Sequence, residues 1–213
     1  MNVDLARDAL IVVDVQNDFL PGGALGVKGG DEVIAPILGL LPRFELVVAT
    51  QDCHPPGHVS FASASGAAPF TTGRTADGRE QAFWPDHCLA GSRGAALAPG
   101  LAGDLDRRAT LVLRKGTRRD TDSYSAFREN LDPRGERPNT GLGAWLAARG
   151  VRRVFVAGLA LDFCVAWTAK DAAAEGFEAV VYLPGARSVF PENDPRTLDE
   201  LERAGVTLRR QPA

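Results

Sequence analysis

The sequence has few of the residues that mark several common protein classes. Its three cysteines are an odd number with no C-x-x-C spacing, which argues against a disulfide framework. The formal net charge is −3 with no long run of like charge, so we expect no nucleic-acid partner. No apolar run approaches the ~20 residues of a membrane-spanning helix, so we expect no membrane partner either. Free thiols and an N-terminus unlike a signal peptide favour a cytoplasmic location.

Length and composition favour one well-packed domain. The 213 residues are enough for a single α/β domain over residues 1–213 and leave little room for a second. Apolar residues make up 45% of the chain, which is enough for a core. The 23 glycines and 14 prolines therefore indicate many tight connections rather than disorder.

Apolar runs alternate with helix-like stretches along the chain. The runs lack polar alternation, which is typical of strands buried on both faces of a parallel sheet. They cover residues 9–13, 45–49, 110–113, 153–158 and 179–183, and residues 206–208 would add an edge strand. The expected helices cover residues 32–41, 142–149, 165–175 and 195–204. This alternation predicts a three-layer, doubly wound α/β domain around a mostly parallel sheet.

One long span does not fit this alternation. Residues 60–108 contain no clear strand and are rich in glycine and proline. A loop of this length in a compact domain is usually functional. We therefore expect a long active-site loop region over about residues 51–108.

All three histidines of the chain lie in this region. His54 follows Asp52 by two residues, and His58 and His87 come later. In extended backbone, side chains two residues apart point to the same side, so Asp52 and His54 form a natural chelating pair. Imidazole and carboxylate ligands suit zinc, iron and manganese alike. Loop histidines that merely cap turns are the alternative at this point.

Four polar or reactive side chains follow predicted strands. They are Asp14, Asp52, Lys115 and Cys164. Each alone has an ordinary structural explanation, but the carboxyl ends of parallel strands share one edge, where ligands bind. A cysteine near a helix start and a lysine favours thiolate, and Asp14 could take the thiol proton. With backbone N–H groups in the turn of residues 158–164 for an oxyanion, the set predicts an acyl-transfer triad without histidine.

Five blocks of the sequence resemble the isochorismatase-like cysteine hydrolases. Residues 13–19 and 158–165 are similar to motifs of that superfamily as a whole. Within it, three further blocks resemble the nicotinamidases, also called pyrazinamidases. These are residues 51–55, residues 84–88 followed by Gly91-Ser92, and Lys115-Gly116 followed by residues 122–127. The blocks keep their order along nearly the whole chain.

The resemblance implies an isochorismatase-like fold with a six-stranded parallel sheet. It implies hydrolysis of nicotinamide to nicotinate and ammonia, and of pyrazinamide to pyrazinoate, through a cysteine thioester. One divalent metal ion is implied, with zinc expected first and iron or manganese as alternatives. The small-molecule partner would be nicotinamide, and a homo-oligomer is an option.

The resemblance also assigns roles to residues by matching position. Asp14, Lys115 and Cys164 would form the triad. The metal ligands would be Asp52, His54 and His87, with His58 as a further candidate and Ser60 acting through water. The oxyanion hole would use the N–H groups of Ala160 and Cys164, next to a cis peptide between Leu159 and Ala160. Phe19, Trp84 and Tyr124 would flank the pyridine ring.

The chain departs from the family pattern at two places. Cys53 occupies a position where an aromatic residue is common, and residues 66–81 look like an inserted lid.

Two alternative functions are disfavoured. A metal-free hydrolase, or another small-amide hydrolase, is disfavoured because the chain carries both the cysteine set and the metal set. A non-enzymatic metal-binding module is disfavoured because structural zinc sites prefer paired cysteine spacings. That module would have used Cys53, His54, His58, His87 and Cys88.

Overall fold

A six-stranded parallel sheet forms the centre of the computed structural model, which describes residues 3–211. The strand order is β5-β2-β1-β6-β7-β8, and every neighbouring pair is parallel. The strands are β1 (Asp8–Val13), β2 (Leu46–Asp52), β5 (Leu111–Lys115), β6 (Arg153–Leu159), β7 (Glu178–Arg187) and β8 (Thr207–Arg209). The sheet expected from the apolar runs is confirmed, including the edge strand.

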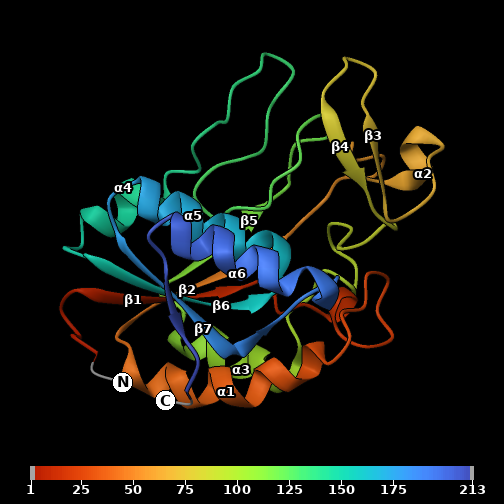
Figure 1. The fold of residues 1–213 in the computed structure, drawn as a ribbon. Helices are drawn as coiled ribbons and strands as arrows, with labels where there is room; N and C mark the ends of the chain where they lie inside the picture. The colour runs from red at the N-terminus through yellow and green to blue at the C-terminus, as the bar shows by residue number, and fades with distance from the viewer. Residues whose placement is uncertain (1–2, 212–213) are drawn as a thin grey trace.

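Helices cover both faces of this sheet, which gives three layers (Figure 1). One face carries α1 (Ile34–Leu40) and α3 (Pro99–Arg108), and the other carries α4 (Leu142–Ala147), α5 (Ala166–Ala174) and α6 (Asp194–Arg203). Along β1, Leu10 and Val12 belong to the first core, whereas Ile11 and Val13 belong to the second. Because β1 is buried on both faces, its sequence shows no polar alternation.

The region of residues 60–108 is more ordered than the sequence indicated. It contains a short helix α2 (Ala62–Ser65), an antiparallel hairpin of β3 (Thr71–Arg74) and β4 (Glu80–Phe83), and α3. The expectation of a strandless loop is therefore wrong. The residues of β3 are polar or glycine and mostly exposed, so hydrophobic alternation could not reveal the strand. In Figure 1 the hairpin and α2 lie together beyond one end of the sheet.

The strand order reverses beside β1. The chain passes from β1 to β2 and then β5 on one side, and β6 lies on the other side. At the carboxyl end of this pair, Gly158 packs against Val13, where a Cβ atom would collide with the Val13 backbone. Gly158 also has a φ of +128°, which disfavours other residues. This close approach brings the residues that follow β1 and β6 to one place, where open α/β sheets bind ligands.

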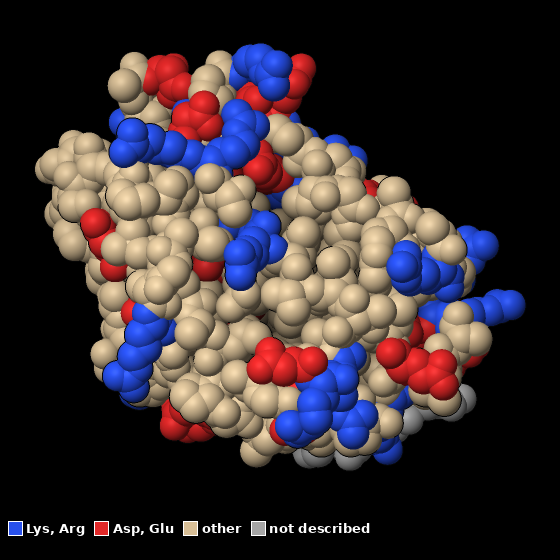
Figure 2. Space-filling model, turned by 180° about the vertical axis from the view of Figure 1, so that it is seen from behind, with Lys and Arg blue, Asp and Glu red and all other residues tan. Residues whose placement is uncertain are grey.

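The surface shows charges of both signs. On the face drawn in Figure 2, basic side chains stand in small separate groups, several beside acidic ones. Surface ion pairs such as Arg107 with Asp104 also bring the two signs together. None of the helices within residues 3–211 is long and apolar enough to cross a membrane.

Candidate active site

Lys115 lies at the centre of a buried cluster of charged and reactive groups. Its Nζ is 2.7 Å from Oδ2 of Asp14 and 3.4 Å from Sγ of Cys164. The same ammonium donates hydrogen bonds to Oδ1 of Asp52 and, at 3.0 Å, to the carbonyl of Ser123. The structure therefore brings together the three residues expected to form the triad.

Asp14 is held by its own backbone and by β2. It follows the last residue of β1 and has a left-handed φ of 48°. The hydroxyl of Thr50 donates to Oδ1 of Asp14 at 2.6 Å and accepts from the Asp14 N–H at 3.2 Å. Thr50 thus fixes one carboxylate oxygen, and the other faces Lys115. A carboxylate oxygen of Asp14 lies within 4.8 Å of the Cys164 sulfur, close enough for a proton to pass after a small movement.

Burial and charge set the protonation states of this cluster. Burial raises the pKa of Asp14 to about 6, although Lys115 acts in the opposite direction. Burial would lower the pKa of Lys115, but Asp14 and Asp52 raise it well above its ordinary value. Burial also raises the pKa of Cys164, and Lys115 only partly offsets this. The resting cluster therefore holds a permanent ammonium, a thiol and a carboxylate that can accept a proton near neutral pH.

Cys164 sits in a one-turn π-helix, η4 (Leu161–Val165), which runs directly into α5. The turn is anchored by Asp162, whose two carboxylate oxygens accept the N–H groups of Val189 and Phe190, each at 2.9 Å. The peptide between Leu159 and Ala160 is cis, as the family resemblance implied. A nucleophile is thus presented at the start of a helix, close to the carboxyl end of β6.

The three expected metal ligands also converge. Oδ2 of Asp52 lies 3.6 Å from Nε2 of His54 and 3.9 Å from Nε2 of His87. Nδ1 of His54 donates to the carbonyl of Gly116 at 2.9 Å, and Nδ1 of His87 donates to the carbonyl of Pro85 at 2.8 Å. Since a carbonyl can only accept, each ring donates from Nδ1 and directs its Nε2 toward Asp52. Burial would lower the pKa of His54, but Asp52 raises it, so a metal ion would replace a proton at Nε2 of His54.

The charges in this group suit a divalent cation. Burial would raise the pKa of Asp52, but Lys115 and His54 lower it below its usual range. Burial lowers the pKa of His87 to about 4, and the neighbouring His54 acts in the same direction. At neutral pH, Asp52 therefore offers a charged oxygen and His87 a free nitrogen lone pair. Ligand atoms about 3.5–4 Å apart fit bonds of roughly 2.0–2.2 Å to one ion.

His58 and Ser60 lie behind His54. Nδ1 of His58 is 2.7 Å from the Ser60 hydroxyl, and its Nε2 is 3.2 Å from the carbonyl of Thr121. The His58 ring stacks on His54 with 4.1 Å between ring centroids. Both nitrogens of His58 thus have partners on the protein, and the ring supports His54 from its far side.

A narrow aromatic pocket leads to Cys164. Phe19, Trp84 and Tyr124 all line it, and the Trp84 indole N–H donates to the Tyr124 hydroxyl at 3.2 Å. Phe163 meets Trp84 edge-on, with 4.8 Å between ring centroids. The remaining lining residues are Leu25, Asp52, His87, Asp122, Ala160, Cys164 and Val189. Only about 20 Å³ of this space is open, little more than one water molecule needs, so the lining side chains must move apart to admit a ring.

Sequence reasoning missed one positioning residue, Gln16. Its buried side chain accepts the N–H of Asp52 and donates to the Asp52 carbonyl, both at 2.8 Å. It donates further to the carbonyl of Ala95 at 2.8 Å. Gln16 therefore joins the end of β1 to the end of β2 and to the loop before α3. An amide two residues after a predicted catalytic aspartate was the available signal.

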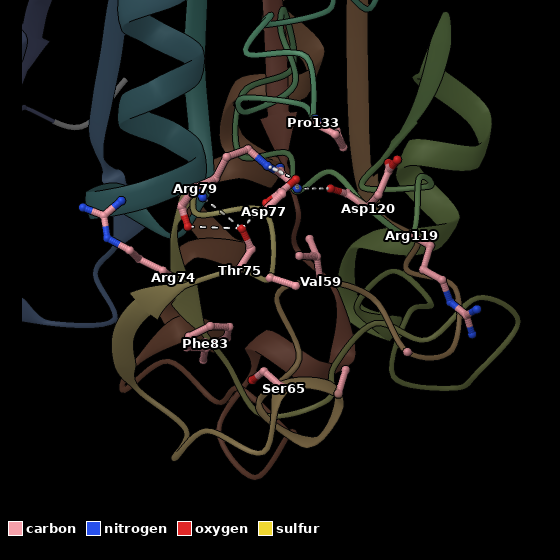
Figure 3. A pocket seen from close by; sticks show the side chains of 13 residues that line it. Val59, Ser65, Arg74, Thr75, Asp77, Arg79, Phe83, Arg119, Asp120 and Pro133 are labelled. Atoms are coloured by element: carbon pink, nitrogen blue, oxygen red, sulfur yellow. Dashed lines mark hydrogen bonds and ion pairs between the residues drawn. The ribbon is translucent and has the colours of Figure 1, made fainter.

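A cavity of about 650 Å³, larger than the aromatic pocket, lies outside the cluster (Figure 3). It lies between the β3–β4 hairpin and the segment that contains Arg119, Asp120 and Pro133, and it contains none of the triad or metal-set residues. Arg79 bridges the two sides, donating to the carbonyls of Asp120 and Leu131 at 2.9 and 2.5 Å. We interpret this cavity as a surface cleft. The Arg79 bridge joins the hairpin to the chain just before Asp122.

Comparison with known proteins gives a consistent result. The family model described as the isochorismatase domain matches residues 8–211. The nicotinamidase of Acinetobacter baylyi is 46% identical over 182 residues, which cover 85% of this chain and 81% of that protein. A solved structure of a nicotinamidase and pyrazinamidase of Acinetobacter baumanii superposes with a TM-score of 0.88 at 40% identity, covering 96% of each chain. The pyrazinamidase of Pyrococcus horikoshii in complex with zinc is similar with a TM-score of 0.76 at 32% identity, covering 96% of this chain and 99% of that one.

Proposed function

Since the chain belongs to the isochorismatase family and shares the nicotinamidase activity of its relatives, we propose that Asp14, Lys115 and Cys164 carry out the hydrolysis. The reaction converts nicotinamide to nicotinate and ammonia, and pyrazinamide to pyrazinoate. The observation that carries the residue assignment is the buried contact of Lys115 with both Asp14 and Cys164. A nucleophile, a proton acceptor and a fixed cation are the groups that thioester formation needs.

The metal is a divalent ion, and we propose Asp52, His54 and His87 as its protein ligands. Their converging oxygen and nitrogen atoms and their burial support this set. Zinc is the first candidate, because it is bound in the Pyrococcus horikoshii relative, and iron and manganese are alternatives. When bound, such an ion supplies an electrophilic partner for the pyridine nitrogen. His58 and Ser60 would support His54 rather than bind the ion, since both His58 nitrogens are already engaged.

In the first half of the reaction, the Cys164 thiol passes its proton to Asp14. The sulfur then attacks the carboxamide carbon, and Lys115 stabilises the charge on the sulfur as it forms. The N–H groups of Ala160 and Cys164 would stabilise the oxyanion of the tetrahedral intermediate. Asp14 returns the proton to the nitrogen, the C–N bond breaks, and ammonia leaves a thioester on the enzyme.

In the second half, water hydrolyses that thioester. Asp14 takes one proton from the attacking water, the C–S bond breaks, and the nicotinic acid that forms releases its remaining proton to solvent to give nicotinate. The proton returns to the Cys164 sulfur, which restores the resting thiol. Phe19, Trp84 and Tyr124 would hold the ring in place throughout, so that the carboxamide stays aimed at the sulfur.

The experiment that tests this assignment traps the covalent intermediate. Metal-loaded enzyme is quenched in acid during turnover of nicotinamide, and the protein is digested and examined by mass spectrometry. We expect a nicotinoyl group on the peptide that contains Cys164. A nicotinoyl group on Cys53 or Cys88 would refute the assignment, and so would full turnover with no acylated cysteine.

A further inference from the structure

Substrate and product differ mainly in charge. Conversion of the carboxamide to a carboxylate leaves the pyridine ring and its nitrogen unchanged. Every aromatic contact in the pocket that holds nicotinamide is therefore available to nicotinate as well. Unless the protein uses the new negative charge, the product would be held at least as firmly as the substrate.

The pocket contains a third carboxylate that neither the triad nor the metal set uses. Asp122 lines the pocket and is only 3% exposed. Its Oδ1 accepts the N–H of Ser123 and its Oδ2 accepts the side-chain amide of Gln81, both at 2.8 Å. One of its oxygens lies within 4.8 Å of ring nitrogens of His54 and His58. Asp122 is thus a fixed, buried acceptor next to the place where the ring must lie.

The β3–β4 hairpin holds this carboxylate in position. Gln81 lies on β4 and is itself 6% exposed, so its hydrogen bond to Asp122 is shielded from water. The hairpin is joined to the same segment at two more points, through Arg79 to the Asp120 carbonyl and through Trp84 to the Tyr124 hydroxyl. These three contacts attach one side of the hairpin to the pocket wall.

We propose that Asp122 is a specificity residue that disfavours nicotinate relative to nicotinamide, and that Gln81 positions it. The inference rests on the proposed function. Lys115, which contacts the Cys164 sulfur, already faces Asp14 and Asp52, so it offers the product no unmatched positive charge, and the proposed metal ion meets the ring nitrogen that both ligands share. A further negative charge on the pocket wall raises the free energy of a bound anion but not of a neutral amide. Because the site is buried, this repulsion is only weakly screened.

The test compares two ligands that share a ring but differ in charge. Nicotinate is negative, whereas 3-pyridylmethanol is neutral, has the same ring nitrogen and carries no bond to hydrolyse. Their dissociation constants are measured by calorimetry on the metal-loaded enzyme and its variants, loaded with the same ion. Using the ratio of the two constants cancels changes in the strength of ring-nitrogen binding. Asp122→Asn is expected to shift the ratio about ten-fold in favour of nicotinate, and Asp122→Glu is expected to leave it within about two-fold.

Two further variants test whether the shift in the ratio could come from any loss of nearby charge or from a disturbed fold. Asp120→Asn removes a charge two residues away, on the exposed cleft, and should leave the ratio unchanged. Gln81→Met keeps the size of the side chain but removes the hydrogen bond, and it should shift the ratio in the same direction by a smaller factor. In the Asp122→Asn background, Gln81→Met should have no further effect on the ratio, which a purely structural role would not produce. If Asp122→Asn does not fold, Gln81→Met alone decides.

An unchanged ratio in folded Asp122→Asn would overturn the proposal, as would an equal shift in Asp120→Asn. Failure of the proposed function has a different signature. If the metal-loaded parent enzyme releases no ammonia from nicotinamide, the function is wrong whatever the ratios are. If the parent is active and the ratio does not move, only the role of Asp122 is wrong.

Discussion

The active site combines a sheet edge with an inserted region, and the two hold their residues in different ways. Asp14, Asp52 and Lys115 stand at or just after strand ends, and the parallel ladder pairs Asp52 directly with Lys115. His87 and Trp84 belong to the region between β2 and β5, where hydrogen bonds outside the sheet fix them, such as His87 to the Pro85 carbonyl and Trp84 to the Tyr124 hydroxyl and the Ser60 carbonyl.

The residues that break the C–N bond are therefore held differently from part of the set that binds the metal and the ring. Asp14 and Lys115 depend on strand ends of the sheet and Cys164 on the turn that follows β6, whereas one metal ligand and part of the ring pocket depend on a segment held by scattered backbone and side-chain hydrogen bonds outside the sheet. We therefore expect changes in the triad to affect turnover, and changes in the inserted region to affect metal and substrate binding. Each prediction below tests this division.

The largest effect is expected at the sheet edge. Cys164→Ala removes the group that forms the thioester, so turnover of nicotinamide should fall by at least about 10⁴-fold. Metal content, measured by mass spectrometry of the dialysed protein, should stay at the parent level because Cys164 is not among the proposed ligands. Loss of metal together with activity would contradict the division.

A smaller but still large effect is expected in the inserted region. His87→Ala removes one of three proposed ligands and should lower both metal affinity and activity by at least about 100-fold. Melting of the metal-free protein should change little, since His87 is outside the sheet. Benzamide lacks the ring nitrogen and should be a very poor substrate of the parent, and this preference for nicotinamide should disappear in the variant. Equal turnover of both amides by the parent would show that the ring nitrogen is not recognised.

The pH dependence of kcat/KM tests the role of Asp14 at the sheet edge. Burial raises the pKa of Asp14 to about 6, and only the ionised carboxylate can take the thiol proton. The value of kcat/KM should therefore fall about ten-fold per pH unit below about pH 6 and level off above it. The profile is measured with saturating metal, so that proton competition for the histidines does not intrude. A flat profile down to pH 5 would contradict the role of Asp14.

A link between the two regions should show an intermediate phenotype. Gln16→Leu leaves the backbone N–H and carbonyl of Asp52 without their buried partner, and it leaves the Ala95 carbonyl with only the longer bond from Gln51. Unsatisfied buried groups cost about 1–3 kcal/mol each, so the free energy of unfolding should drop by about 2–4 kcal/mol. Turnover should fall about ten-fold. Urea unfolding and initial rates measure the two effects, and Gln51→Leu, a half-buried neighbour with one bond to the Ala95 carbonyl, is the matched control.

The smallest effect is expected at the far side of the inserted region. Arg79→Ala removes the bridge to the carbonyls of Asp120 and Leu131, so amide hydrogen exchange in the hairpin should become faster. Turnover should stay within about three-fold of the parent. Arg74→Ala is the control, because the Arg74 side chain donates within the same hairpin, to the Gly78 carbonyl. An equal increase in exchange in both variants would argue against the bridge.

The sheet edge was the part most accessible to sequence reasoning. Apolar runs allowed the strands that lead to Asp14 and Lys115 to be placed within a residue or two, although only β1 is buried on both faces and β5 is a partly exposed edge strand. The topology then predicted that Asp14, Lys115 and Cys164 would lie close together. The distances from Lys115 to Asp14 and Cys164 agree with this prediction. For these residues, the apolar runs and the rule that the carboxyl ends of parallel strands share one edge were sufficient.

The inserted region could not be predicted in the same way. Strand β3 has no apolar residue to show its period, although Asp77-Gly78 is a known hairpin signal that was available. Helix α3 buries Leu101 and Leu105 but contains Gly100 and Gly103, which weaken its helical pattern. The contact between Gln81 and Asp122 joins residues 41 positions apart and has no local signature.

The burial of Cys164 has a consequence for the lifetime of the enzyme in an oxidising environment. Peroxides and alkylating reagents react with thiolates, not with thiols. Burial raises the pKa of both Cys164 and Cys88, so the resting protein offers these reagents little thiolate at either sulfur. Cys53, which is half-buried, is then the first sulfur that a reagent meets. Oxidative damage should accumulate at a residue outside the triad, and the nucleophile would be spared between turnovers.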